Sequence, residues 1–409
     1  MPSLRAASLR HANHYSHVAE EANVRYLRGH DEAQRGLSLF TQEQAQIDAG
    51  WSWAVRSAGA SDADILLVTY AGVTSDIGAF LYDAYIQRIP RLELALAVVR
   101  RMGREDMESK LLGNLGTAYD DAGDPQHAIT HHEQSLAMDR QVGDHQGEGI
   151  ALTNLGNSYA ALGQFQEAIR CYEQALAIIE PLEDYRTQGM LLGSLGLALA
   201  DLGQSDRALN FFEQALLIAR SLGDPRNEAN VLSNLGRAYT DLGDTQQALA
   251  YYQQAQTLAH DIGDRRSEGS VLGNLGVLAY QQGDFQQAIA YYEQALAISR
   301  EVKDQHMEGE VLGYLGSAYA DLGELDRAAT YHEQGLAIIR VIGDRRGEAV
   351  SCWNLGDILV RRGDLAQAVE LMQMCVDYER AVDHVDAEAD AAYVAELRQR
   401  IMATSELHI

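Results

Sequence analysis

The chain has 409 residues, only five of them proline, and a formal net charge of −27 at neutral pH. This charge argues against DNA or RNA as a partner, because phosphate binding requires clustered lysine and arginine. No stretch approaches the roughly 18 uninterrupted apolar residues of a membrane span, and the first residues lack a secretory signal pattern, so we expect a cytoplasmic protein without membrane partners.

The first part of the chain differs from the rest in charge. Residues 1–110 carry a net charge of −2, whereas 111–409 carry −25. We predict an N-terminal cap of two or three irregular helices over 1–70. Residues 71–110 align with the segment 40 residues further on, so we interpret them as a degenerate repeat unit whose second helix opens at Pro90.

A repeat of fixed length begins near residue 111. Seven units of 40 residues fill 111–390 without insertion or deletion, each with a glycine at the same place. A constant period of this length indicates a solenoid, in which each unit packs only on its neighbours. The recurring glycines are Gly116, Gly156, Gly196, Gly236, Gly276, Gly316 and Gly356.

Each unit is predicted to contain two helices. In the second unit, Leu152, Leu155 and Tyr159 form one apolar helix face, and the helix ends at Gly163. A second apolar face follows at helical spacing. Gly-Asp pairs such as Gly223-Asp224 mark the end of one helix and the N-cap of the next. The recurring glycine near the middle of the first helix would let the two helices approach closely.

The end of the chain is predicted to form a capping helix. Ala391, Val394, Leu397 and Ile401 recur at helical spacing. This apolar stripe could cover the exposed face of the last unit. We therefore assign residues 391–409 to a C-terminal capping helix and tail.

The repeat resembles the tetratricopeptide repeat. Leu112, Leu115, Gly116, Tyr119 and Ala128 have the spacing of that family. The 40-residue period is similar to Pins-type adaptors, kinesin light chains and, most of all, the C-terminal arms of bacterial STAND-class signalling ATPases. The resemblance implies an all-α fold, a right-handed superhelical solenoid of antiparallel helix pairs with helical caps at both ends. No Gly-x-x-x-x-Gly-Lys-Ser/Thr motif occurs, so nucleotide-driven switching does not follow from it.

We find no constellation of residues for catalysis or metal binding. His11, His14 and His17 share a helix face, but no cysteine or acid completes a known ligand pattern. Cys171, Cys352 and Cys375 also lack metal-ligand spacing, and their odd number is typical of a reducing compartment. The sequence therefore predicts no enzyme, no metal and no cofactor, and a stability that chelators and reductants do not change.

Function is then expected from a surface on the first helices. At 100° per residue, positions 110, 114, 117 and 121 lie opposite the apolar face, and in a tetratricopeptide superhelix they would line the concave wall. The first and third positions change chemical class from unit to unit, whereas the second keeps asparagine in five of seven. The predicted peptide-binding residues are Asn114, Asn154, Asn234, Asn274, Asn354, Thr117, Asn157, Arg237, Asp121, Asp201, Asp241 and Asp321.

Two interpretations stay open at the asparagine and aspartate positions. The asparagines could hold the backbone of an extended partner, or simply bond the adjacent helix. The aspartates could attract a basic partner. Alternatively, they could pair with Arg186, Arg226 or Arg266 of a following unit, in exposed ion pairs that contribute little.

The sequence favours a non-enzymatic module that binds a protein or extended peptide, as the scaffold or sensing arm of a signalling system. Two alternatives remain: a metabolite sensor and a structural protein that self-associates. A deep apolar pocket would favour the metabolite, and an open polar groove the peptide. Poorly covered ends would favour self-association.

Overall fold

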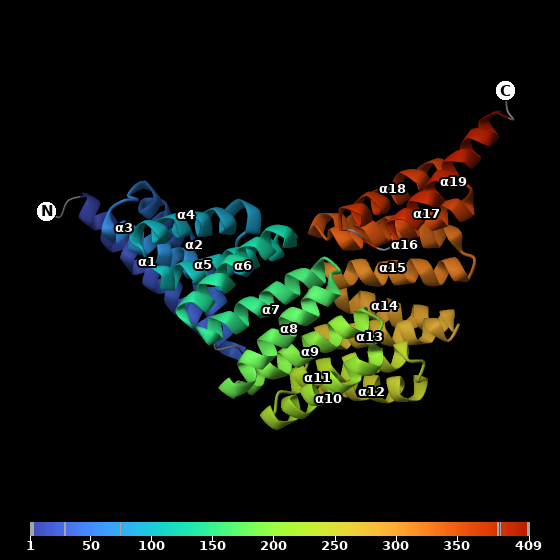
Figure 1. Ribbon diagram of the computed structural model, residues 1–409, viewed down its shortest axis with the longest axis horizontal. Helices are drawn as coiled ribbons and strands as arrows, with labels where there is room; N and C mark the ends of the chain where they lie inside the picture. The colour runs from blue at the N-terminus through green and yellow to red at the C-terminus, as the bar shows by residue number, and fades with distance from the viewer. Residues whose placement is uncertain (1–3, 28–29, 74, 383, 385, 407–409) are drawn as a thin grey trace. The chain divides into compact units, whose positions relative to one another are not determined.

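The computed structural model describes residues 4–27, 30–73, 75–382, 384 and 386–406 (Figure 1). Helices account for 88% of the structure, and no strand occurs among the described residues. The helices form consecutive packed pairs, which confirms the predicted all-α array. No described helix has the length and apolarity that a membrane span requires.

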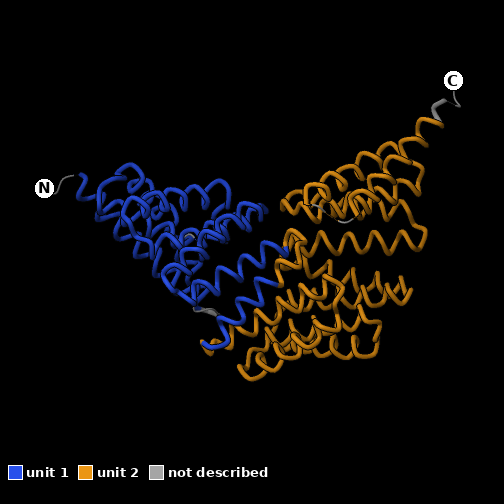
Figure 2. Tube along the Cα trace, viewed as in Figure 1, with its two compact units in different colours: residues 1–160, 170–181 blue, residues 161–169, 182–409 orange. Residues whose placement is uncertain are grey.

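The chain divides into two compact units, which are coloured separately in Figure 2. Unit 1 comprises residues 1–160 and 170–181, and unit 2 comprises 161–169 and 182–409. This division comes from contacts within the structure. The sequence-based division into two caps, a degenerate unit and seven repeats stays a prediction.

Unit 1 begins with three helices around an aromatic core. Phe40, Leu67 and Tyr70 are buried there, and the Tyr70 hydroxyl donates a hydrogen bond of 2.7 Å to the Ala12 carbonyl oxygen. The helices of unit 1 are α1 (Leu4–Leu27), α2 (His30–Arg56), α3 (Ser61–Val73), η1 (Ile77–Phe80), η2 (Ala84–Arg88), α4 (Ile89–Met102), α5 (Glu105–Asp121), α6 (Pro125–Val142), α7 (His145–Ala161) and the later part of α8 (Phe165–Ile179).

The segment before the first regular pair has a feature that the sequence did not predict. η2 is a single π-helical turn that leads directly into α4, where Pro90 lies in the first turn. Arg88, its last residue, is only 1% exposed. A charged side chain this deeply buried needs a partner, and Arg88 Nη1 donates to Asp121 Oδ2 at 2.6 Å.

Unit 2 contains the longer run of repeats. Within it, first helices alternate with second helices at the 40-residue period. The helices are α9 (Tyr185–Asp201), α10 (Ser205–Leu222), α11 (Pro225–Asp241), α12 (Thr245–Asp261), α13 (Arg265–Gln281), α14 (Phe285–Val302), α15 (Gln305–Asp321), α16 (Leu325–Ile342), α17 (Arg345–Arg362), α18 (Leu365–Ala381) and α19 (Ala387–Glu406), with η3 (Glu180–Leu182) at the boundary between the units.

The recurring glycine has the predicted steric role. A Cβ built at Gly236 on α11 would lie 2.5 Å from Cε1 of Tyr252 on α12. The same conflict arises between Gly156 and Tyr172 in unit 1. An aromatic ring of the second helix thus lies directly on the first helix, at a place where only a missing side chain leaves room.

The helix ends follow the predicted Gly-Asp punctuation. Gly223 ends α10 with a φ of 61°, in the left-handed region that favours glycine. Asp224 then caps α11, its side chain accepting a hydrogen bond from the Asn227 amide at 3.1 Å. The same cap recurs at Asp124, Asp184, Asp244, Asp264, Asp284, Asp304 and Asp344.

The last helix packs on α18 through the predicted apolar stripe. Val394 and Leu397 are buried against Met372 and Val376. An ion pair between Arg380 and Glu388 joins the two helices at 3.1 Å. Equivalent Arg–Glu pairs join the second helix of one repeat to the first helix of the next at five of the seven earlier junctions, so α19 packs as a first helix does. These pairs are Arg100–Glu108, Arg140–Glu148, Arg220–Glu228, Arg300–Glu308 and Arg340–Glu348.

Candidate binding surface on the first helices

In unit 2 the first helices form the more closely packed row. From α9 through α11, α13 and α15 to α17, each first helix contacts the next one, whereas successive second helices, in the described part of the chain, make at most slight contact. Residues that point away from the core on the first helices therefore lie beside their counterparts in neighbouring repeats. The predicted site residues of unit 2 belong to these helices, and those of unit 1 belong to the first helices α5 and α7.

We call positions 110, 114, 117 and 121 and their equivalents in the other repeats the stripe. The five asparagines at its second position are half-buried. In unit 2, Asn274 Nδ2 donates a hydrogen bond of 3.0 Å to Ser233 Oγ on the preceding first helix. This contact supports the interpretation that the asparagine at that position bonds the adjacent helix. The residues concerned are Asn114 and Asn154 in unit 1 and Asn234, Asn274 and Asn354 in unit 2.

Side chains at the third position of the stripe also form contacts within the chain. In unit 1, Thr117 Oγ1 donates to the Gly113 carbonyl oxygen at 3.2 Å, and Asn157 Oδ1 accepts from the Tyr172 hydroxyl at 2.7 Å. In unit 2, Arg237 forms an ion pair with Asp201 on the preceding first helix. These side chains are thus held in defined positions, which the sequence pattern alone did not indicate.

The four aspartates of the stripe all have partners. Asp121 pairs with the buried Arg88, and Asp201 with Arg237. Asp241 Oδ2 accepts from Ser205 Oγ at 3.3 Å. Asp321 accepts from the Tyr280 hydroxyl and lies 3.9 Å from Arg361 Nη1. The acidic residues are therefore bonded within the chain rather than free.

The predicted alternative partners of these aspartates are wrong. Arg186, Arg226 and Arg266 each pair with the N-cap aspartate of the next unit. The distances are 3.4, 2.8 and 2.6 Å, to Asp224, Asp264 and Asp304 respectively. The reason is geometric: an arginine in the first turn of one first helix reaches the first turn of the next, whereas the stripe aspartates lie at the other end of the helix.

The pKa values of two ionisable side chains on the row are raised by their surroundings. Burial raises the pKa of Asp241, and the nearby Asp201 raises it further, while Arg237 and the Ser205 hydroxyl oppose the change. Burial together with the hydrogen bond to Asp321 raises the pKa of Tyr280 to about 12. The tyrosine is therefore a hydrogen-bond donor, not an anion, at neutral pH.

Large apolar side chains are exposed at the first position of the stripe. Met190 is 61% exposed and Val350 53%, both in unit 2, and Ile150 in unit 1 is also 53% exposed. Tyr314, which takes the asparagine position in its unit, is 41% exposed and stacks on Tyr292 with 5.4 Å between ring centroids. The sequence pattern indicates changing chemistry at this position but does not distinguish these apolar residues from the others.

A hollow on the surface of unit 2 lies elsewhere. It is an open depression of about 570 Å³ beside α12, lined by polar side chains such as Gln253 and Asp261 and by apolar ones such as Leu232 and Leu258. An open hollow lacks the enclosure that small-molecule sites usually have. The first-helix row thus remains the better candidate surface.

An array of antiparallel helix pairs at a 40-residue period defines a helical repeat protein. Its sequence matches the tetratricopeptide repeat over residues 108–181, 187–261, 227–301, 267–340 and 307–381, which is more than half of the chain. The chain belongs to the tetratricopeptide repeat family. Among curated proteins, none matches the sequence.

Several solved structures have a similar fold. A Rap protein complexed with Competence and Sporulation Factor is 16% identical, with a TM-score of 0.59, and the match covers 89% of this chain and 99% of that one. The apo form of RapI is also 16% identical, with a TM-score of 0.56 and coverages of 93% and 99%. A STAND protein with a tetratricopeptide repeat sensor from Pyrococcus horikoshii is 14% identical, with a TM-score of 0.49, covering 95% of this chain and 59% of that one.

Proposed function

We propose that the chain is a non-enzymatic interaction module that binds a protein or extended peptide along the row of first helices, as a scaffold or sensing arm of a signalling system. The observation that carries the proposal is the exposure of Met190 and Val350 on this row. Large apolar side chains in water are unfavourable by about 25 cal/mol per Å² of apolar surface. A partner that covered them would gain that free energy.

The polar residues of the row support the same function. Arg237 is held by Asp201, and Asn274 by Ser233, so their positions are set before a partner arrives. Side chains that are already ordered lose less conformational entropy when they bind. Apolar contacts would then supply affinity, and the fixed polar groups would select the partner's sequence.

The fold comparison supports the class of function. The Rap protein of similar fold is complexed with Competence and Sporulation Factor, so an array of this architecture can hold a partner. We extend only this general capacity to the present chain. The ligand chemistry proposed here comes from the chain's own exposed side chains.

Peptides selected for binding from a displayed random library test the proposal. Binding of such a peptide to the unaltered chain and to a Met190→Asp, Val350→Asp double variant is compared by fluorescence anisotropy. Loss of two apolar contacts of roughly 1 kcal/mol each should weaken binding at least tenfold. Both residues are exposed, so the helix content measured by circular dichroism should stay the same.

Leu217→Asp is the matched control, because Leu217 is 68% exposed but lies on the second helix α10. This variant should bind as the unaltered chain does. The proposal is wrong if the selected peptides bind the double variant normally, or if only Leu217→Asp weakens their binding.

A further inference from the structure

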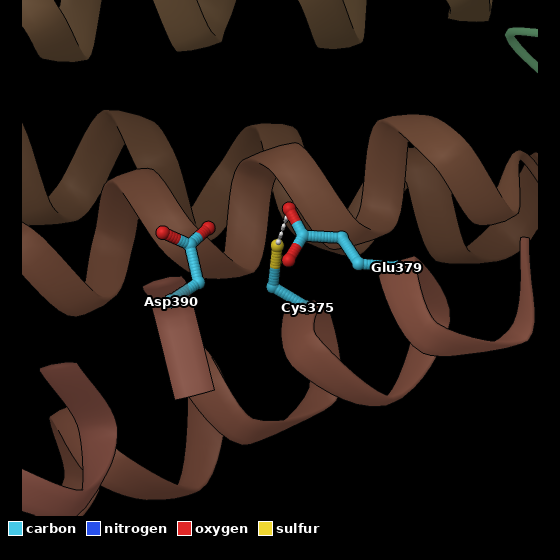
Figure 3. Close-up of side chains that lie close together, drawn as sticks. All are labelled: Cys375, Glu379 and Asp390. Carbon is cyan, nitrogen blue, oxygen red and sulfur yellow. Dashed lines mark hydrogen bonds between the residues drawn. The ribbon is translucent and has the colours of Figure 1, made fainter. Parts of the chain in front are cut away.

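A mixed cluster of one thiol and two carboxyl groups joins the last two helices. Cys375 and Glu379 lie one turn apart on α18, and Asp390 lies in the first turn of α19 (Figure 3). One possible ligand atom from each residue lies within 4.8 Å of the others. Among the residues that the structure describes, no other trio of His, Cys, Asp or Glu side chains meets this condition.

The Glu379 carboxylate is buried with half of its hydrogen-bonding capacity unused. The residue is 9% exposed, and Oε1 accepts from Cys375 Sγ at 3.5 Å. Oε2 is fully buried and has no hydrogen-bond donor. The side chains of Cys375 and Asp390 face it (Figure 3), and the Asp390 carboxyl group can satisfy it only by sharing a proton with it. A buried carboxylate oxygen without a donor is costly and requires a counter-ion or a proton.

The fold itself does not require polar groups at this place. Forty residues earlier, Cys375 and Glu379 correspond to Gly335 and Ile339. The central units have alanine at the cysteine position and isoleucine, alanine or serine at the glutamate position. These residues are Ala175, Ala215, Ala255 and Ala295, and Ile179, Ala219, Ala259 and Ser299.

The first unit offers a direct comparison. There, Ser135 and Asp139 take the two positions, and the hydroxyl groups of Ser109 and Ser135 donate to the Asp139 carboxylate. An acid at this position is thus satisfied by hydroxyl donors when the site is built for a carboxylate alone. In the last unit, the Cys375 thiol takes the place of the Ser135 hydroxyl, and Ala349, which has no donor, takes the place of Ser109.

We propose that Cys375, Glu379 and Asp390 bind one divalent cation of the zinc class, which ties α19 to the last repeat. Thiolate sulfur and carboxylate oxygen are both common zinc ligands. Tetrahedral coordination would separate neighbouring ligand atoms by about 3.3–3.6 Å. The distance from Cys375 Sγ to Glu379 Oε1 is already 3.5 Å, so only small side-chain rotations are needed.

Binding of the cation would displace the thiol proton to solvent, because the thiolate is the ligand. The fourth coordination place is filled by water or by His384, whose Nδ1 lies 4.0 Å from Glu379 Oε1. This inference is independent of the proposed peptide-binding function. It also differs from the sequence-based expectation of no metal, which rested on the absence of a known ligand spacing.

Cobalt(II) is the probe for the test, added to the full chain after removal of metal with a chelator. Thiolate coordination should give a near-ultraviolet charge-transfer band that saturates at one cobalt per chain and is displaced by zinc. Cys375→Ser should abolish the band. Glu379→Gln, which keeps the shape of the side chain, should weaken cobalt binding at least tenfold while the thiol remains.

Cys171→Ser is the matched control, because Cys171 is also buried but lies outside the cluster. It should leave the cobalt band unchanged. Zinc should also slow hydrogen exchange in α19 of the unaltered chain and not in the Glu379→Gln variant. The proposal is overturned if the unaltered chain shows no charge-transfer band, or if Glu379→Gln binds cobalt as tightly as the unaltered chain.

Discussion

At the scale of single residues, the array depends on a few close contacts in which an added atom would clash. The ring of Tyr292 lies on Gly276 so closely that an added Cβ would be 2.5 Å from Cδ1. Three residues earlier on the same helix, a Cβ at Gly273 would meet nothing within 4 Å. Two glycines of one helix thus have different reasons for being glycine.

We therefore expect opposite effects from two alanine substitutions in α13. Gly276→Ala should destabilise the array by about 1–3 kcal/mol, because the ring must move out of a packed core. Gly273→Ala should stabilise it by up to about 1 kcal/mol, because alanine is the better helix former. Urea unfolding followed by circular dichroism measures both, and equal effects would contradict the steric explanation.

The aromatic position holds a histidine in two repeats, as His132 and His332. His332 is 2% exposed, and its burial lowers the pKa of the imidazole to about 4. In an unfolded chain the imidazole would titrate near 6.5. As the pH falls below 6.5, the unfolded state takes up the proton first, so the folded state loses stability until about pH 4.

The chain should thus lose about 3 kcal/mol of stability at this residue between pH 6.5 and pH 4. His332→Phe is the matched variant, because Phe212 takes the same position in another repeat. It should lack this component of the pH dependence. The difference in unfolding free energy between the two chains, measured at several pH values, should be constant above pH 7. A difference that is also constant below pH 6 would show that the imidazole is not buried as described.

At the scale of helices, the N-caps show which contacts hold a helix end. Asp284 precedes α14 and accepts a hydrogen bond from the Gln287 amide at 3.0 Å. Asp364 precedes α18 at the same place in its repeat but makes no such bond. The same residue type at the same position thus contributes differently.

Asp284→Ala should cost about 0.5–2 kcal/mol, the usual range for loss of an N-cap. Asp364→Ala should cost clearly less, because there is no capping bond to lose. Hydrogen exchange at the first turns of α14 and α18 gives a local measure of each change. Equal increases in exchange at both helices would mean that the capping bond is not what holds α14.

Helix ends were predictable from sequence because their signals are local. Gly223-Asp224 specifies a left-handed residue followed by a cap within two positions. Contacts that depend on neighbouring helices were not predictable in this way. The partners of Arg186 and the burial of Arg88 depend on how helices align across a repeat. The cluster at Cys375 likewise requires the packing of α19 on α18, which no ligand spacing expresses.

The position of the candidate surface on each helix was predictable for the same reason as the helix ends, because helical periodicity is a local signal. Helical periodicity identifies the stripe opposite the core, and the structure places Asn274 and Asp201 on it, half-buried and exposed respectively. Their hydrogen-bond partners could not be predicted, because Ser233 and Arg237 belong to neighbouring helices. Periodicity describes one helix, whereas a surface is built from several.

At the scale of the whole molecule, the net charge attracts a partner over a longer range than the paired aspartates do. Asp201 and Asp321 have cationic partners, so the short-range attraction that they could offer a ligand is largely used within the chain. The net charge of −27 remains, and its field extends about 10 Å into solution at 0.1 M salt. A basic partner would therefore be attracted at long range more than it is held at contact.

We accordingly expect a basic peptide selected against the array to associate faster at low salt. Raising the salt from about 0.02 M to about 0.2 M should lower the association rate at least fivefold, while the dissociation rate changes little. The variant with Asp201, Asp241 and Asp321 changed to Asn lowers the net charge only to −24. Its association rate should fall less than twofold. Stopped-flow fluorescence separates the two rates. Strong weakening by these three changes at constant salt would instead place the attraction at the stripe itself, and faster association of an acidic peptide would reverse the sign of the partner.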